Sequence, residues 1–509
     1  MSQTVRFKAS QLHARTNLEG LVFSGADSTL SALTADSRQV QPGTLFAALS
    51  GSQQDGNRFI PQAIEAGASA LLFATPPSFP LPETLAQFSH PQPRLALAHL
   101  AETFYDHPGT KLKLAAITGT NGKTSVAAMM ESILMVAKER VGIIGTTGIR
   151  WPDHQQNNPL TTPDSISLQA CLAQMVEADC RFAVLEVSSH ALSQHRVEGL
   201  PFHVALFTNL SRDHLDYHGC QESYFRAKAS LFLHNPPPFA VINLDDSHGI
   251  TLFEECPEST EKIGFSLQGG GAERARGYPI LTAKEVTLSQ NSSQFQLVTP
   301  AGSLPICLPV AGRFNVANAL AAAGGAWALG LDCETIAAGL AHFRPHPGRM
   351  NSLDLGQPFG VIIDFAHTPD GLENLIKAAR ETLTNGRILT VFGCGGDRDP
   401  GKRQQMGEIS GRLSDRTFIT DDNPRHEEPA AIRAAIVQGC HLSAPASQTE
   451  QVTPREEAIL QALTQARAGD MVLIAGKGHE THQIIADEKR PFDDRQVAIQ
   501  ALNQLGYSG

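Results

Sequence analysis

The sequence predicts an α/β protein of about three domains. Its 509 residues are too many for one hydrophobic core, because domains commonly hold roughly 100 to 200 residues. Apolar runs of strand length alternate with amphipathic helical stretches, and most of these runs end in small or polar residues. Parallel strands that are buried on both faces show this pattern. A Gly-rich turn at residues 117–125, between an apolar run and a helical stretch, also fits a parallel α/β sheet.

The N-terminal residues 1–92 are predicted to form a small α/β domain. Residues 45–51 indicate a strand, and residues 61–73 indicate a helix that leads into another strand. The Pro-rich residues 90–94 mark the expected end of this domain. The Asp-Ser-Arg turn at residues 36–38 is, from composition alone, a solvated loop.

A central domain is predicted for residues 93–345, beginning with a helix that ends near Tyr105. In ITGTNGKTS the glycines let successive N–H groups point inward, and the following helix N-terminus adds partial positive charge. The general phosphate-loop motif is only partly matched, because two residues separate the glycines where the common motif has four. A P-loop ATPase-like parallel sheet is therefore expected. Its expected nucleotide contacts are Gly119, Thr120, Asn121, Gly122, Lys123 and Thr124, with Thr124 also a Mg²⁺ ligand.

Polar residues end the other strand-like runs of the central domain. These runs are residues 141–148, 182–189, 204–211 and 239–246. Since ligands bind at the carboxyl ends of parallel strands, Glu186 and His214 could lie beside the phosphate loop. Glu186 suits Mg²⁺ and His214 is a less usual donor, although spacing alone favours a surface acid and a packed histidine over metal ligands. Lys228 alone reads as an exposed helix lysine.

The C-terminal residues 346–509 predict a doubly wound (Rossmann-like) domain without a second Gly-Lys-Thr loop. Its strand-like runs are residues 359–367, 387–396, 416–422 and 471–480, and each ends in polar or charged residues.

Composition narrows the functional classes. A formal charge of −11 argues against nucleic acid as a partner, because phosphate-backbone binding needs clustered Lys and Arg. No apolar run approaches the roughly 20 residues of a membrane span, and the start has no apolar signal core, so a cytoplasmic protein is expected. The eight scattered cysteines indicate neither a disulfide framework nor a zinc site.

A set of short motifs resembles the Mur ligases, and within that family the members that add the third peptide residue to UDP-N-acetylmuramoyl-L-alanyl-D-glutamate. The motifs run from about residue 36 to residue 480, in the order found in the family, and the short spacing of the phosphate loop is the family's own pattern. They are TGTNGKTS, EVSSHAL, FTNLSRDHLDYHG, YFRAKASLF, GRFNVANALAA, HPGRM, DFAHTPDGLENLI, FGCGGDRDPGKR, DNPR and GKGHE.

The resemblance implies ATP-dependent amide ligation through an acyl phosphate, with ATP as co-substrate and Mg²⁺ as cofactor. The implied catalytic residues are Lys123, His214 and Lys228. The implied metal ligands are Thr124, Glu186, His214 and Lys228, the last as a carbamate. The implied further ATP contacts are Asn315, Asn318, Arg349 and His367, of which Asn315 taken alone reads as a helix cap.

The resemblance also implies the substrate contacts. UDP would lie near Ser37 and Arg38. The muramoyl dipeptide would be held by Thr161, Thr162, Ser188, Gln194 and Arg196. The meso-diaminopimelate site would contain Arg398, Asp422, Asn423, Arg425, Gly476 and Glu480. Family members that use lysine generally lack an arginine at the position of Arg425, but without the resemblance DNPR reads as a turn with an exposed arginine.

Other functions remain open at this level. The same ligase could take L-lysine, or the chain could be a folylpolyglutamate synthetase-like ligase, a nucleotide-dependent switch or an inactive scaffold. The expected partners are small-molecule substrates only, and a monomer is expected. Because ligand motifs are divided between the central and C-terminal domains, a closing motion is also expected.

Overall fold

The computed structural model describes residues 6–51, 55–269, 271, 273–289, 291–346, 348–383, 385–445 and 448–508. Residues 1–5 and Pro347 of HPGRM therefore lie outside the described residues. The chain divides into two compact units. Unit 1 holds residues 1–118, 138–205 and 227–239, and unit 2 holds residues 119–137, 206–226 and 240–509. Both contain helices and parallel strands, which confirms the predicted α/β class.

Unit 1 begins with a sheet in the order β2-β7-β6-β5-β4, in which all but β2 run parallel. Its strands are β2 (Val22–Gly25), β4 (Ala32–Thr34), β5 (Thr44–Ala47), β6 (Ala70–Phe73) and β7 (Ala86–Ser89), beside the short pair β1 (Phe7–Lys8) and β3 (Thr29–Leu30). Alternate residues point to opposite faces, so Leu45 and Leu72 join the core under α1 (Ala9–Arg15) and α3 (Pro93–Phe104). Phe46 and Leu71 face α2 (Ile60–Glu65) instead. The strand, helix and strand predicted here are confirmed.

Unit 1 also contains part of the central sheet, in the order β11-β10-β9-β12-β8. The strands are β8 (Lys113–Thr118), β9 (Val141–Gly145), β10 (Gly148–Trp151), β11 (His154–Gln156) and β12 (Phe182–Glu186). Strand β12 lies parallel to both β8 and β9, as the buried apolar runs predict, whereas β10 and β11 add an antiparallel edge. Two capped helices follow polar segments, α5 (Ser165–Glu177) after Asp164 and α6 (Ser189–Ser193) after Ser188.

Strand β13 (Phe202–Phe207) and helix α8 (Gln221–Leu233) each have residues in both units. In unit 2, helix α4 (Lys123–Val136) follows the Gly-rich turn, and the short α7 (Leu215–His218) follows His214. The other elements of this part are β14 (Phe239–Asn243), whose first residue belongs to unit 1, α9 (Ser247–Glu255), β15 (Glu261–Ser266), β16 (Ile280–Leu288), β17 (Ser293–Thr299), β18 (Gly302–Leu308), α10 (Arg313–Ala328) and α11 (Cys333–His342). Strands β16 to β18 form an antiparallel meander that the sequence did not predict.

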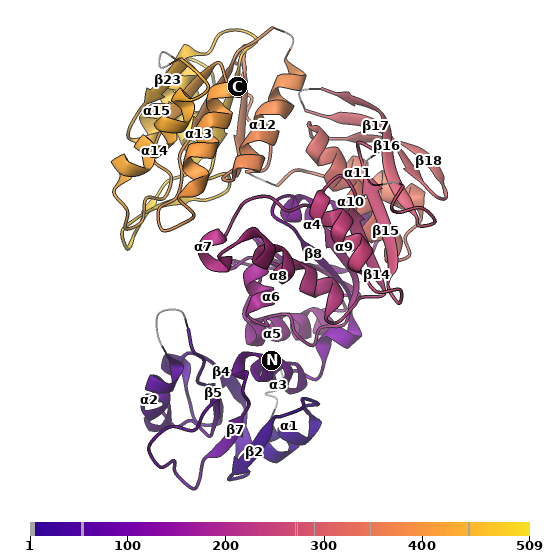
Figure 1. Ribbon diagram of the computed structural model, residues 1–509, viewed down its shortest axis with the longest axis vertical. Helices are drawn as coiled ribbons and strands as arrows, with labels where there is room; N and C mark the ends of the chain where they lie inside the picture. The colour runs from indigo at the N-terminus through magenta and orange to yellow at the C-terminus, as the bar shows by residue number, and fades with distance from the viewer. Residues whose placement is uncertain are drawn as a thin grey trace. The chain divides into compact units, whose positions relative to one another are not determined.

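The C-terminal part of unit 2 is the predicted doubly wound domain. Its sheet order is β19-β20-β24-β21-β22-β23, parallel except for β19. The strands are β19 (Asn351–Ser352), β20 (Gly360–Asp364), β21 (Ile388–Phe392), β22 (Arg416–Ile419), β23 (Thr449–Gln451) and β24 (Met471–Ala475). Helices α15 (Arg455–Gln465) and α16 (Asp494–Gln504) share a core with one face. Helices α12 (Pro369–Thr382), α13 (Gly401–Leu413) and α14 (Pro429–His441) cover the other face (Figure 1).

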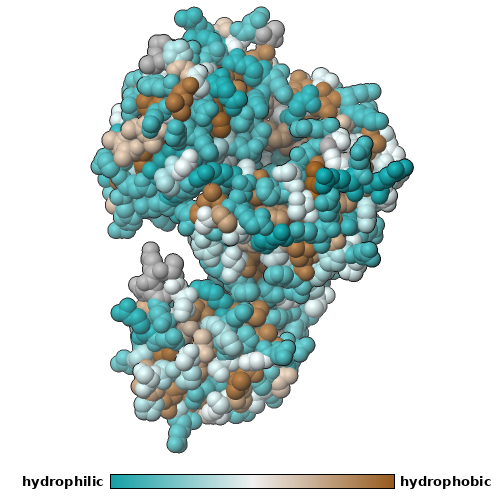
Figure 2. Space-filling view, in the orientation of Figure 1, coloured by the Kyte–Doolittle hydropathy of each residue, from teal (hydrophilic) through white to brown (hydrophobic). Residues whose placement is uncertain are grey.

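A small antiparallel hairpin, β25 (His482–Ile485) and β26 (Glu488–Pro491), follows β24. Most residues on the visible surface are hydrophilic, with apolar residues scattered among them (Figure 2). Over the described ranges, no helix is both long and apolar enough to cross a membrane.

Candidate active site

The Gly-rich turn adopts a backbone that only glycine tolerates at two positions. Gly119 has φ 147° and Gly122 has φ 90°. A Cβ atom at Gly119 would overlap the Thr208 hydroxyl, and one at Gly122 would overlap the Asn318 side chain. The two glycines therefore allow both the turn and the close approach of its neighbours. Helix α4 begins directly after Gly122, as predicted.

The segment after β13 holds the turn in place. The Asn209 carbonyl accepts a hydrogen bond from Thr120 N (2.9 Å), and the Asn209 side chain accepts one from Asn121 N (2.9 Å). The Thr208 hydroxyl donates to the Asn121 carbonyl at 2.6 Å. The Thr120 hydroxyl also lies 3.2 Å from the Tyr224 hydroxyl, whose pKa burial raises. These contacts preorganise the turn.

Lys123 and Thr124 follow the turn. Lys123 Nζ donates to the carbonyls of Gly119 (2.8 Å) and Thr120 (2.9 Å), so its ammonium lies against the loop. Thr124 is buried and accepts a hydrogen bond from Arg349 Nη2 at 3.3 Å. The guanidinium of Arg349 stacks on the ring of Phe365, 4.9 Å from its centroid. Three of the predicted ATP contacts thus lie together in unit 2.

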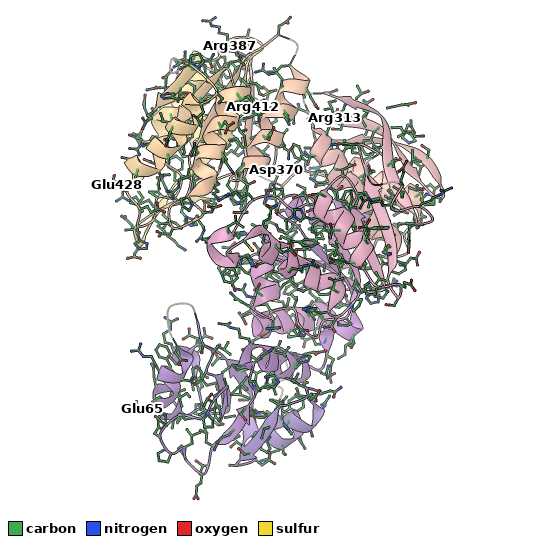
Figure 3. The ribbon with its side chains drawn as sticks, in the orientation of Figure 1. Glu65, Arg313, Asp370, Arg387, Arg412 and Glu428 are labelled. Atoms are coloured by element: carbon green, nitrogen blue, oxygen red, sulfur yellow. The ribbon has the colours of Figure 1, made fainter. Side chains whose placement is uncertain are left out.

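A cavity of about 450 Å³ opens beside this loop within unit 2. Asn121, Asn315, Asn318 and Arg349, all predicted ATP contacts, line it. Its lining also includes Arg313 at the start of α10 and Asp370 at the start of α12, which are labelled in Figure 3. Asn315 and Asn318 belong to α10, and Asn318 Nδ2 donates to Asn315 Oδ1 at 3.4 Å. A cavity with polar groups beside a phosphate-type loop can hold a nucleotide.

Carboxylates that the sequence analysis did not assign also surround the loop. Asp370 Oδ2 accepts from Asn121 Nδ2 at 2.9 Å, and burial raises the pKa of Asp370. Asp364 ends β20 and accepts from Met350 N at 2.7 Å; burial raises its pKa, against the pull of Arg349. Both lie in a quoted motif, and the end of a predicted strand was the signal that could have found Asp364.

Asp213 is the centre of a second cluster that was missed. It lies 3.4 Å from His214 Nε2, 3.8 Å from His367 Nε2 and 4.0 Å from Lys402 Nζ. Burial opposes its charge, but the hydrogen bond from His367 and the charges of His214 and Lys402 hold the pKa of Asp213 well below its usual range. The cluster joins His214 and His367, which were predicted from separate motifs. No pattern in the sequence indicates that Lys402 lies near Asp213.

In unit 1, the predicted dipeptide contacts gather around the end of β12. The Thr162 hydroxyl donates to the Glu186 carbonyl at 2.9 Å and accepts from Ser188 N at 3.0 Å. Arg196 donates to the Thr162 carbonyl (2.7 Å) and, through Nε and Nη2, to Gln194 Oε1. The structure therefore brings these side chains into one cluster.

Glu186 has a defined carboxylate orientation in unit 1. Its Oε1 accepts from Thr146 N at 3.0 Å, and its Oε2 accepts from the Thr146 hydroxyl at 3.1 Å. The oxygen of the same hydroxyl lies 3.3 Å from Thr161 Oγ1, which connects the last predicted dipeptide contact to this group. A Cβ atom at Gly145 would overlap the carboxylate, so a glycine is needed beside it.

Ser37 and Arg38 lie on the short 3₁₀ turn Ser37–Gln39 in unit 1. Arg38 pairs with Asp36 through both carboxylate oxygens, and its side chain is 82% exposed. The Ser37 hydroxyl donates to Gln62 Oε1 at 3.0 Å. This is the polar, solvated turn that composition predicts.

The four predicted metal ligands are divided between the two units. Thr124 and His214 belong to unit 2, and Glu186 and Lys228 belong to unit 1. Lys228 is buried, which corrects the exposed helix lysine that its sequence alone suggests. In the part of the chain that is described, no group of three or more His, Cys, Asp and Glu side chains could hold a metal ion.

The predicted amino-acid contacts meet beside β24 and the hairpin β25–β26. Asn423 Nδ2 donates to Glu480 Oε2 at 2.8 Å. Arg425 has φ 51° and donates from Nη1 to the Gly396 carbonyl at 2.7 Å. Its backbone is held by Ile484 O (3.1 Å) and Ala486 N (2.8 Å). Arg425 is half-buried rather than exposed, which corrects the reading of DNPR as a solvated turn.

The other predicted residues of this group lie around Arg425. Burial and the nearby positive charge of Arg398 lower the pKa of Arg425, so an anion between the two guanidinium groups would be stabilised. Gly476 has φ 111°, and a Cβ there would lie 2.7 Å from Asp422 Oδ2. Lys477, which was not predicted, is fully buried and contacts both Asn423 and Glu480.

Three regions of the sequence match known family profiles. Residues 29–105 match the Mur ligase family, catalytic domain; residues 117–326 match the Mur ligase middle domain; and residues 348–478 match the Mur ligase, glutamate ligase domain.

Relatives that are 40–44% identical over nearly the whole chain share one printed name. The UDP-N-acetylmuramoyl-L-alanyl-D-glutamate–2,6-diaminopimelate ligase of Gloeobacter violaceus is 44% identical, over 98% of this chain and 99% of its own. The enzyme of that name from Geobacillus kaustophilus is 41% identical, over 95% and 97%. A solved structure of a ligase of that name has a TM-score of 0.66 at 32% identity and covers 94% of this chain and 96% of its own.

A more distant structure shares the fold. Mycobacterium tuberculosis folylpolyglutamate synthase, complexed with ADP and AMPPCP, has a TM-score of 0.61 at 18% identity. It covers 75% of this chain and 92% of its own. At this identity the likeness concerns the architecture alone.

Proposed function

The chain belongs to the Mur ligase family, and we propose that it joins meso-diaminopimelate to UDP-N-acetylmuramoyl-L-alanyl-D-glutamate in peptidoglycan precursor synthesis. The observation that carries this proposal is the similarity of nearly the whole chain to enzymes named for diaminopimelate ligation. Mur ligases use ATP and Mg²⁺. The folylpolyglutamate alternative has only the shared fold in its favour.

The reaction requires activation of a carboxylate, which is by itself a poor acyl donor. Phosphoryl transfer from ATP to the dipeptide carboxylate gives an acyl phosphate and ADP, and attack by the incoming amine then forms the amide and releases phosphate. Lys123 and the N-terminus of helix α4, directly after Gly122, would bind the nucleotide phosphates as charge is redistributed. Bound Mg²⁺, with Thr124, Glu186 and His214 as protein ligands, would supply further positive charge.

The domains and remaining residues are assigned in the same proposal. Residues 1–92 bind UDP, residues 93–345 bind ATP, and residues 346–509 bind the amino acid. In the first domain Ser37 and Arg38 contact UDP. The dipeptide is held by Thr161, Thr162, Ser188, Gln194 and Arg196. Asn315, Asn318, Arg349 and His367 contact ATP. The clustering of the dipeptide residues around the β12 end supports this assignment.

The same proposal includes a carbamate on Lys228. A carbamate would replace the Lys228 ammonium by a carboxylate-like anion, and the side chain is buried. We also propose that the enzyme acts as a cytoplasmic monomer, where ATP is supplied. Light scattering of the purified chain and fractionation of cells test these two statements, and a stable dimer or a membrane-bound pool would contradict them.

Selectivity for diaminopimelate would come from its second amino-acid centre, which carries a carboxylate that lysine lacks. Arg425 and Arg398 would bind this carboxylate, with Asp422, Asn423, Gly476 and Glu480 around the rest of that centre. The lowered pKa of Arg425 supports this, because an anion there relieves repulsion between the two guanidinium groups. Lysine would leave Arg425 without its partner, a cost of about 1 to 3 kcal/mol.

The test is phosphate release with ATP, Mg²⁺ and UDP-N-acetylmuramoyl-L-alanyl-D-glutamate, in parallel with meso-diaminopimelate, L-lysine or no amino acid. Release only with diaminopimelate is expected. Release with lysine instead would keep the ligase and overturn the role of Arg425. Steady release without any amino acid would favour a nucleotide-dependent switch, and no release at all would favour an inactive scaffold.

A further inference from the structure

Lys477 is a lysine with no exposed surface, placed between three segments of the C-terminal domain. Its Nζ donates to Asn423 Oδ1 at 3.1 Å, to Glu480 Oε2 at 2.9 Å and to the His482 carbonyl at 2.7 Å. An ammonium has three N–H donors and no acceptor, so these three oxygens use all of them. Lys477 therefore connects the DNPR segment, the turn after β24 and the hairpin β25–β26.

These bonds determine how the Asn423 amide is oriented. Its Oδ1 accepts from both Lys477 Nζ and Ile484 N (3.0 Å), so the oxygen side of the amide is used. Its Nδ2 must then be the donor to Glu480 Oε2. An amide nitrogen has two N–H groups, and one of them remains for a ligand.

Glu480 is fixed in the same way. Its Oε2 accepts from both Lys477 and Asn423, whereas no described group donates to its Oε1. The Glu480 side chain is 29% exposed, so this oxygen can be reached. One carboxylate oxygen of Glu480 and one N–H of Asn423 thus stay available beside Arg425.

We propose that Lys477 is a positioning residue that makes the site selective for an amino acid with a second zwitterionic centre. This rests on the proposed function. Lys477 holds the Glu480 carboxylate and the Asn423 amide in one orientation, so that Glu480 Oε1 faces a ligand ammonium while Arg425 takes the ligand carboxylate. Lys477 itself has no donor left for the substrate, and it acts through its two partners.

The charge of Lys477 has a second effect. Burial opposes ionisation of Glu480, but the neighbouring Lys477 ammonium and the Asn423 hydrogen bond keep the pKa of Glu480 below its usual range. The other charged or titratable groups that act on Glu480 are Arg425, Arg455, His367 and His479. Without Lys477, the burial effect is less opposed and the pKa of Glu480 rises. Proton uptake by Glu480 would then compete with binding of an ammonium.

The experiment compares wild type with Lys477→Met, using phosphate release at varied meso-diaminopimelate and saturating ATP and UDP-linked dipeptide. Loss of two fixed ligands predicts a KM for diaminopimelate raised about tenfold or more, with the KM for ATP unchanged. That KM should rise further as the pH is lowered. In Lys477→Met/Glu480→Gln the extra pH dependence should vanish, because the titrating group is gone. Lys489→Met is the matched control, since Lys489 is an exposed lysine of the same hairpin.

Wild type is measured first, and if it shows no diaminopimelate-dependent release, the proposed function fails and not the role of Lys477. If wild type is active, a folded Lys477→Met with an unchanged KM for diaminopimelate overturns the inference. An equal rise in the KM of all substrates, or a KM without added pH dependence, also overturns it and leaves a structural role. If thermal melting shows that Lys477→Met is unfolded, Lys477→Gln, which keeps two donors, replaces it in the same comparison.

Discussion

Gly119 shows how one missing Cβ atom permits a binding loop. Its φ of 147° and the neighbouring Thr208 hydroxyl both exclude a side chain. We predict that Gly119→Ala displaces the loop and lowers ligand-dependent phosphate release about a hundredfold or more. Gly330→Ala is the control for backbone strain without a steric clash, because Gly330 has φ 93° but no atom lies within 4 Å of the position of its Cβ atom. That control should cost about 1 kcal/mol of stability and keep its activity. A Gly119→Ala enzyme of normal rate would remove the loop from phosphate binding.

The carbamate on Lys228 gives a second prediction at this scale. Lys228 is buried, and an alanine there would remove the anion that the carbamate supplies. Lys228→Ala should therefore lose activity, and formate or acetate should partly restore it by replacing the missing carboxylate. Lys284→Ala, which removes an exposed lysine on β16, is the control. Its activity should equal that of wild type and should not change when the acids are added. Full activity of Lys228→Ala without added acid would exclude the carbamate from the mechanism.

The site residues that the sequence could predict are those within short motifs. Lys123 and Thr124 follow a Gly-rich turn, so their neighbourhood is set by residues next to them in the chain. Asp213 and Lys402 lie 4.0 Å apart but belong to separate motifs, and no local pattern reports such a distance. The contact between Lys477 and Asn423 was missed for the same reason, because Asn423 lies in a separate segment that only the fold brings to Lys477.

Asp470 links the starts of β24 and β21, two neighbouring strands of the C-terminal sheet. It precedes β24, and its carboxylate accepts from Arg387 N (2.8 Å), Arg387 Nη2 (2.6 Å) and Arg467 N (2.8 Å), with Arg387 just before β21. Its side chain is almost completely buried. Burial opposes ionisation, but these donors lower the pKa of Asp470 below its usual range. The ionised carboxylate therefore stabilises the folded state.

We predict that Asp470→Asn lowers the free energy of unfolding by about 1 to 3 kcal/mol at neutral pH, because charge-assisted hydrogen bonds are lost. Since the pKa is lowered on folding, this contribution is present above the unfolded value of about 3.9 and is lost as the pH falls through the folded value. Urea unfolding at neutral and acidic pH measures the difference. Glu488→Gln, in an exposed pair with Arg490, should change little. A difference between wild type and Asp470→Asn that does not shrink in acid would refute the assignment.

The sequence predicts best those strands that are buried on both faces of their sheet. The runs that became β20, β21, β22 and β24 are nearly continuous apolar segments, as central parallel strands require. The meander strand β16 was missed because it contains Lys284 and Glu285 and is interrupted by a register shift between Lys284 and Thr287. The hairpin β25–β26 was missed because it is polar and short. Yet this hairpin holds the backbone of Arg425.

At the scale of the whole molecule, the central and C-terminal sequence regions contact each other within unit 2. Asn121 of the phosphate loop donates to Asp370 of α12 at 2.9 Å, and Arg349 donates to Thr124 at 3.3 Å. Arg212 forms a two-point contact with Asp399, from Nε to Oδ2 at 2.9 Å and from Nη2 to Oδ1 at 3.3 Å. Ligation requires the activated carboxylate and the amine to meet, so contacts of this kind would stabilise the arrangement in which both ends of the reaction are assembled.

We predict that Arg212→Met lowers kcat/KM for ATP and for diaminopimelate together, by about tenfold, because the Arg212–Asp399 pair is a bidentate charge-assisted contact. Asp399→Asn should have a similar effect, and the double variant should be little worse than either, since both remove the same interaction. Arg274→Met, in the exposed pair with Glu254, is the matched control and should leave both values unchanged.

Small-angle X-ray scattering with UDP-linked dipeptide and a non-hydrolysable ATP analogue supplies the second measurement. Wild type is expected to become more compact on binding, and Arg212→Met is expected to become less compact than wild type. Additive losses in the double variant, or equal compaction in both proteins, would show that this pair does not hold the assembled state.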